Sequence, residues 1–157
     1  MPGRSELEPA ELRSILPDLI LIDVGTAPDG QGHTFTYRLA GTEIDRRLGV
    51  NLTGRRLEEV PLGDAAAAIR KQYEAVVAEA RPIFCKHKVV IGGERYVEYE
   101  RLVVPLSGDQ PGQITALAAA VDFHCAFTIA NGRPPDCTTP PFCDRIDHCL
   151  AQTPGNT

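Results

Sequence analysis

The sequence predicts an α+β fold with an antiparallel sheet. Two observations predict it. The strand-like segments occur in runs instead of alternating with helices, which is typical of antiparallel sheets. Short Gly-rich turns also separate neighbouring strands, as in hairpins. The length of 157 residues suits a single domain, and a hydrophobic fraction of 43% is enough for one core.

The first elements are a short helix and a hairpin. The N-terminal segment, residues 1–17, is predicted to be helical over 9–16, with an apolar stripe made of Leu12, Ile15 and Leu16. Strands are predicted near 19–24 and 34–40 because both stretches are apolar or alternating and are bounded by turn residues. Alternation would place one face of the second strand toward the core, with Phe35, Tyr37 and Leu39.

The other face of this strand carries Arg38. We expect it to form an ion pair or lie in solvent, and the alternative is a contact with the N-terminal segment or a dimer partner. The chain then enters a short helix. Thr42 is the predicted N-cap, Ile44 and Leu48 share one side of the helix, and Gly49 ends it.

A longer helix is predicted over 64–80, before Pro82, with an apolar stripe formed by Leu62, Ala66, Ile69, Tyr73, Val76, Val77 and Ala80. Strands near 83–91 and 95–106 flank the turn Gly92-Gly93. The apolar positions of the second of these strands change parity, which predicts a bulge near Glu100-Arg101. The Ala-rich stretch 114–123 is ambiguous between helix and strand, and its flanking turns favour a strand.

Four short motifs stand out along these elements: Tyr37-Arg38, Gly41-Thr42, Leu52-Thr53-Gly54-Arg55 and Pro105-Leu106. Together they resemble a bacterial PAS-domain family with short, mostly standalone members. The resemblance covers about residues 9–123 and implies a PAS-like domain over 18–123. It further implies an antiparallel sheet of five strands in the order 2-1-5-4-3, with helices on one face and a small cavity under them. Members of such a family sense a ligand, a redox state or a partner.

The strand face and the helix stripe must bury each other, so we expect them to surround this cavity with Phe35, Tyr37, Ile44, Leu48, Ile69, Tyr73 and Val76. The ligand is expected to be a small apolar or carboxylate compound. Arg55 either braces the connector or holds a carboxylate at the cavity mouth. The candidate ligand-binding residues are Tyr37, Ile44, Leu48, Arg55, Ile69 and Tyr73.

Several classes of function find no support in the composition. A net charge of −5 without a long basic run argues against nucleic acid. No apolar stretch reaches the roughly 18 residues of a membrane span, and no export signal is visible, so a cytoplasmic protein is expected. We expect no catalytic residues and no cofactor. The long helix lacks a histidine for haem, the Asn-Cys-Arg of light-sensing PAS domains is missing, and the chain has no Trp.

The tail, residues 124–157, is rich in Pro and Cys. Its thiols and imidazole are zinc-type ligands, namely Cys137, Cys143, His148 and Cys149, with His124 and Cys125 nearby. The tail lacks two Cys-x2-Cys pairs. If Cys143 and Cys149 share a helix, they lie about 120° apart around it. We therefore expect reduced cysteines and no metal site, with metal binding and redox sensing as alternatives.

The resemblance therefore leads us to expect a PAS-like sensory or protein-interaction domain without an output domain of its own. Such a protein signals through a protein partner, with a homodimer as one arrangement. One alternative is a small cone-shaped enzyme of the steroid-isomerase type, with Asp122 and His124 as an acid–base pair. A metal-binding protein that uses the tail is another. The polar content of the cavity separates enzyme from sensor.

Overall fold

The computed structural model of the chain describes residues 12–108 and 112–128. Its strands are β1 (Leu19–Thr26), β2 (His33–Ala40), β3 (Ile83–Ile91), β4 (Arg95–Ser107) and β5 (Ile114–Thr128). Its helices are α1 (Thr42–Leu48) and α2 (Ala65–Glu79), with short 3-10 turns η2 (Leu16–Asp18) and η3 (Leu57–Glu59). Helix α2 starts and ends within one residue of its predicted bounds, whereas β5 runs on beyond the predicted end at 123.

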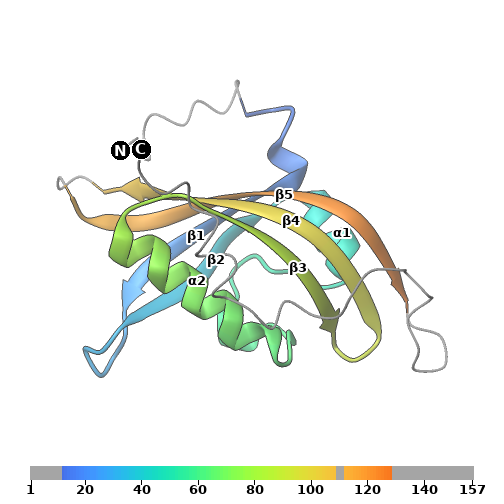
Figure 1. Cartoon of the computed structure of the whole chain (residues 1–157), viewed down its shortest axis with the longest axis horizontal. Coiled ribbons are helices and arrows are strands. Elements are labelled where there is room, and N and C mark those ends of the chain that lie inside the picture. Colours follow the sequence, from blue (N-terminus) through green and yellow to red (C-terminus); the bar gives the residue numbers. More distant parts are fainter. Residues whose placement is uncertain (1–11, 109–111, 129–157) are drawn as a thin grey trace, which may run out of the picture.

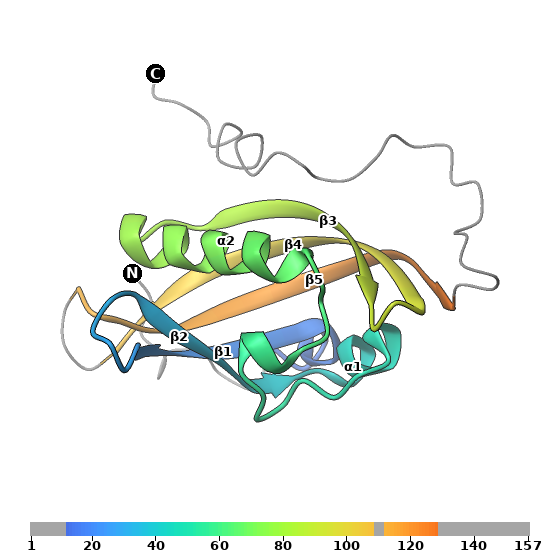
Figure 2. The same ribbon diagram turned by 90° about the horizontal axis from the view of Figure 1, so that it is seen from below.

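The five strands form one antiparallel sheet in the order β2-β1-β5-β4-β3, which confirms the expected topology. The sheet is arched, and α2 lies across one of its faces (Figure 1). Seen from below, α1 lies on the same side as α2 but near the other end of the sheet (Figure 2). The hydrophobic core fills the space between this inner face and the two helices.

The strand β2 departs from simple alternation. Leu21 pairs with Leu39, but the next residue of β1, Ile22, pairs with Tyr37, so that Arg38 is the extra residue of a β-bulge. The prediction that Leu39 shares the inner face of Tyr37 is therefore wrong: Leu39 is 38% exposed on the outer face. Arg38 is exposed and lies 3.6 Å, Nη1 to Oδ1, from Asp23.

The bulge predicted near Glu100-Arg101 is also misplaced. The strand β4 keeps strict alternation through this region, and the extra residue is His124 on β5, at the register shift opposite Glu98 and Tyr99. As a result Arg101 takes an inner position and is only 2% exposed, while its neighbour Leu102 faces outward. The charged side chain of Arg101 therefore points into the core, at the place where the sequence pattern had predicted a bulge.

The junction between β2 and α1 begins one residue earlier than predicted. Gly41 is the N-cap, Thr42 is the first helical residue, and no side chain caps the helix. The backbone of Gly41 passes close to η2, because an added Cβ would lie 2.1 Å from the carbonyl oxygen of Pro17. The glycine of the Gly-Thr motif is thus required by a close approach of two chain segments.

The helix predicted over 9–16 is contradicted in the part that the structure describes. Residues 12–15 form a turn, which leads into η2 with Pro17 inside it. The carbonyl of Leu12 accepts hydrogen bonds from the amides of Ile15 and Leu16. Residues 1–11 and the tail from 129 on, including the helix considered for Cys143 and Cys149, lie outside the described residues.

Candidate functional site

A small cavity lies between the inner face of the sheet, α1, the connector after α1, and α2. Its volume is about 20 Å³. The wall is apolar except for two tyrosines and one arginine, and it is formed by Ile20, Tyr37, Ile44, Leu48, Leu52, Val60, Leu62, Ile69, Tyr99, Arg101, Val121 and Phe123.

The connector is attached to β2 by backbone hydrogen bonds. The amide of Tyr37 donates to the carbonyl of Arg55 at 2.8 Å, and the amide of Gly54 donates to the carbonyl of Tyr37 at 2.7 Å. The side chain of Thr53 accepts a bond from the amide of Ala40, and Asp45 of α1 accepts one from the amide of Leu52. The Leu-Thr-Gly-Arg motif therefore ties the connector to the sheet edge and places Leu52 in the cavity wall.

Arg101 is the charged group of this wall. Its Nη1 donates to the hydroxyl of Tyr73 at 2.9 Å, and its Nη2 donates to Oε1 of Gln72 at 2.8 Å. Both partners belong to α2, and the guanidinium carbon lies 4.9 Å from the ring centre of Tyr73. The Nε of Arg101 has no acceptor among residues 12–108 and 112–128. Within the described part of the chain no carboxylate lies in ion-pair distance of it, so both of its partners are neutral.

The ionisable groups around the cavity leave it with one positive charge at neutral pH. Burial opposes the charge of Arg101, but the neighbouring phenols of Tyr73, Tyr99 and Tyr37 raise its pKa on balance, and the guanidinium stays protonated. Burial raises the pKa of Tyr99 to about 12 and that of Tyr37 well above its ordinary value. Both phenols are therefore neutral at pH 7.

His87 lies behind this wall. Its ring stacks on Tyr99, with 5.0 Å between ring centres. Burial, helped by the charge of Arg101, lowers the pKa of His87 to about 2. Within the part of the chain that the structure describes, its Nε2 has no hydrogen-bond partner. The histidine is thus a neutral ring inside the core.

The structure brings together four of the six predicted ligand-binding residues: Tyr37, Ile44, Leu48 and Ile69 line the cavity. Tyr73 is fully buried beside it and holds Arg101. Arg55 is exposed on the connector and does not line the cavity. Two further residues expected around it, Phe35 and Val76, are buried in the core but are not part of the wall.

Sequence reasoning missed Arg101 and Tyr99. The signal was present, because unbroken alternation along β4 puts Val97, Tyr99, Arg101 and Val103 on one face. The acid–base pair considered for an enzyme lies elsewhere: Asp122 and His124 are exposed, and His124 approaches Glu100 at 3.5 Å. Among the described residues no carboxylate lines the cavity.

Metal binding is not supported by the part of the chain that the structure describes, where no three His, Cys, Asp or Glu residues are grouped to hold an ion. Cys137, Cys143, His148 and Cys149 lie outside it. No helix in the described ranges combines the length and the apolar character needed to cross a membrane.

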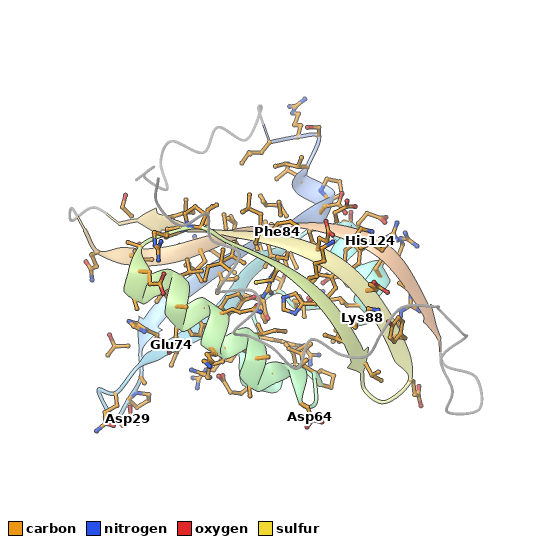
Figure 3. The ribbon with its side chains drawn as sticks, in the orientation of Figure 1. Asp29, Asp64, Glu74, Phe84, Lys88 and His124 are labelled. Atoms are coloured by element: carbon orange, nitrogen blue, oxygen red, sulfur yellow. The ribbon has the colours of Figure 1, made fainter. Side chains whose placement is uncertain are left out.

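The outer face of the sheet carries an apolar patch, which we call the outer patch and define as Leu21, Leu39, Phe84, Leu102 and Val104. Phe84 and Leu102 are cross-strand partners and are 48% and 43% exposed. Farther along the strands, the same face carries the ion pairs Lys86–Glu100 and Lys88–Glu98. Figure 3 labels Phe84 within the outer patch, with Lys88 and His124 nearer the β3–β4 turn.

A family model described as a PAS domain matches residues 1–120. Among solved structures, a LOV protein of Rhodobacter sphaeroides is similar, with a TM-score of 0.53 and 15% identity over 73% of this chain and 65% of that chain. Vibrio cholerae VqmA, solved bound to DPO, gives the same TM-score and identity over 74% of this chain and 57% of its own. A VqmA–ligand–DNA complex matches over 50% of the VqmA chain.

The chain thus spans between half and two thirds of the length of these solved proteins, and at 15% identity they show a common fold alone. No curated protein matches the chain.

Proposed function

We propose, from the premise that the chain belongs to the PAS-domain family, that it binds a small ligand in the cavity under its helices and passes the change to a protein partner. PAS domains are typically sensory, non-enzymatic modules. The observation that carries the proposal is the cavity itself, which has apolar walls with a single polar cluster around Arg101. Such a combination is typical of small-molecule sites. The DPO complex of VqmA supports it as an example of ligand binding by a protein of similar fold.

The size of the cavity indicates how binding would be coupled to a signal. A volume of about 20 Å³ holds roughly one water molecule. A ligand of several heavy atoms therefore requires the wall to move outward. Binding then selects an expanded form of the domain, which is the thermodynamic basis of a sensor.

The movable part of the wall is the connector, because Leu52, Val60 and Leu62 approach the cavity from a segment with little regular structure. Its backbone bonds to Tyr37 transmit any displacement to β2. In this mechanism the strand at the edge of the sheet moves when the cavity fills.

Native mass spectrometry of the whole chain purified from cells tests the proposal. The matched variant is Val121→Phe, which fills the cavity from β5, and the control is Glu79→Gln at the exposed end of α2. We expect a small-molecule adduct on the wild type and on the control, and its loss in the cavity-filled variant. A wild type that carries no adduct after isolation, and none after incubation with a cell extract of small molecules, contradicts ligand binding.

The outer patch supports a second property, an interface with another protein. Large apolar side chains are exposed side by side on β3 and β4, and exposed apolar patches of this kind mark interaction sites. The neighbouring charges are of both signs, Lys86 and Lys88 against Glu98 and Glu100. A face with an apolar centre and balanced charges is complementary to itself, as a two-fold interface requires. A second copy of the chain is therefore the partner that we propose.

A further inference from the structure

We infer that the ligand of the cavity is a small monocarboxylate with an apolar body, and that Arg101 binds its carboxylate group. The inference rests on the proposed function, since it names the chemical class of the ligand for the same cavity. It is carried by a buried guanidinium that has no counter-charge in the described residues and lines a wall that is apolar apart from two neutral tyrosines.

A buried charge without an opposite charge is costly, so it requires a reason. Burying an ion is tolerated when a counter-ion or several hydrogen bonds compensate for lost water. Among the described residues, Arg101 has only the neutral oxygens of Tyr73 and Gln72 as partners, and its Nε–H has no acceptor. The compensation is thus incomplete, and an anion in the cavity would supply what is missing.

The guanidinium is also held in place before any ligand arrives. Tyr73 and Gln72, which are neighbouring residues of α2, hold it by hydrogen bonds. Its guanidinium carbon also lies 4.9 Å from the centre of the Tyr73 ring. Arginine presents its N–H donors in a rigid fork that matches the two oxygens of a carboxylate. A ligand that meets a fixed fork loses less entropy on binding than one that must order the side chain.

The charge and the walls together define the ligand. Arg101 is the single cation of the wall, so it neutralises one negative charge, whereas a phosphate dianion would leave a second one unpaired in apolar surroundings. The neutral phenols of Tyr37 and Tyr99 add hydroxyl groups without repelling an anion. The remaining wall, with Ile44, Leu48 and Val121 among its members, favours an aliphatic or aromatic body.

Thermal melting of the whole chain with defined probes tests the inference. The probes are straight-chain carboxylates from acetate to octanoate and benzoate, each beside its neutral amide, with inorganic phosphate as a third arm, all at constant ionic strength. We expect at least one carboxylate to raise the melting temperature, while its amide and phosphate do not. Arg101→Gln should weaken this binding about ten- to a hundredfold, as expected for a lost charge-assisted bond.

The control variant is Arg81→Gln, which removes an exposed arginine just after α2 and should leave the carboxylate effect unchanged. Circular dichroism verifies that Arg101→Gln is folded. If it is not, the comparison of each acid with its amide on the wild type still tests the inference. Equal stabilisation by acid and amide overturns the inference and points to an internal water on Arg101. A carboxylate effect that persists in Arg101→Gln overturns it as well.

The two experiments distinguish a wrong ligand class from a wrong proposed function. A neutral small molecule that co-purifies in native mass spectrometry, with no carboxylate effect on melting, overturns the carboxylate and retains the sensor. The lack of any adduct and any probe effect overturns both.

Discussion

At the scale of single residues, His87 makes the fold sensitive to acid. Its pKa is about 2 in the folded chain because the ring is buried, whereas an unfolded histidine has a pKa of about 6.5. Below pH 6.5 the unfolded chain binds a proton that the folded chain does not. The free energy of unfolding therefore falls as the pH drops through this range, by about 2 kcal/mol at pH 5 relative to pH 7.5.

The substitution His87→Phe keeps a ring beside Tyr99 and removes the titrating group. We expect urea unfolding at pH 7.5 and pH 5 to show a smaller acid loss in this variant than in the wild type. His124→Gln is the control, because His124 is an exposed histidine on β5. If His87→Phe loses as much stability in acid as the wild type does, the acid sensitivity has another source.

Arg101 shows why part of the site was not predictable from the sequence. Arginine is almost never fully buried without a charged partner, so an inner position for it contradicts the usual preference. Because Leu102, Val104 and Leu106 are apolar, the pattern predicts that they face the core after a bulge. Simple alternation along β4 instead places Arg101 inward and Leu102 outward, as observed. Tyr37, Ile44, Leu48 and Ile69 were predictable because strand and helix periodicity point them at each other.

At the scale of elements, the junction between β2 and α1 depends on one glycine. A Cβ on residue 41 would lie 2.1 Å from the carbonyl oxygen of Pro17 and 2.3 Å from that of Leu16. Because both atoms belong to the backbone, Gly41→Ala must displace η2. We expect it to lower the free energy of unfolding by about 3 kcal/mol in chemical denaturation.

Thr42→Ala is its matched control. Thr42 is exposed and makes no capping bond, so its replacement should change the free energy of unfolding by less than about 0.5 kcal/mol. A large loss in Thr42→Ala together with a tolerated Gly41→Ala would reverse this account of the junction.

The orientation of α2 about its axis is tested by Ile69, which is fully buried against the sheet and also lines the cavity. Ile69→Ala should cost about 2–5 kcal/mol of unfolding free energy, from lost burial and the space left behind. Lys71→Ala, on the exposed side of the same helix, should be nearly neutral. Similar melting temperatures for the two variants would show that the helix presents a different face to the core.

Features defined by a local pattern were predicted better than the exact register of the strands, although the strand order agrees with the one that the family resemblance implied. The stripe of α2 and the turn Gly92-Gly93 lie within short stretches of sequence, so their signals are local. The stripe is correct except at its end, where Ala80 is exposed, and at Gln72, which is buried although it was not expected to be. The bulges at Arg38 and His124 arise from how two strands align with each other. No single stretch contains that information, and each bulge changes the face of the residues beyond it, as for Leu39.

At the scale of the whole molecule, the two faces of the sheet differ in what they contact. Its inner face carries the core and the cavity, while its outer face carries the outer patch. The same strand contributes to both: on β4, Leu102 belongs to the outer patch and its neighbour Arg101 lines the cavity on the inner face. A change in sheet curvature on ligand binding would therefore reach a partner on the outer face without a separate linker.

The proposed partner, a second copy of the chain, leads to a test by oligomeric state. Replacing Phe84 and Leu102 with Gln removes the most exposed apolar area of the outer patch, where neither side chain contributes to the core. We expect sedimentation equilibrium to give the mass of two chains for the wild type and of one chain for the double variant, with little change in melting temperature. Replacing Lys71 and Glu79 on α2 with Gln, away from this face, should leave the mass at two chains. A wild type that sediments as a single chain at every concentration would exclude the second copy as the partner of the outer patch.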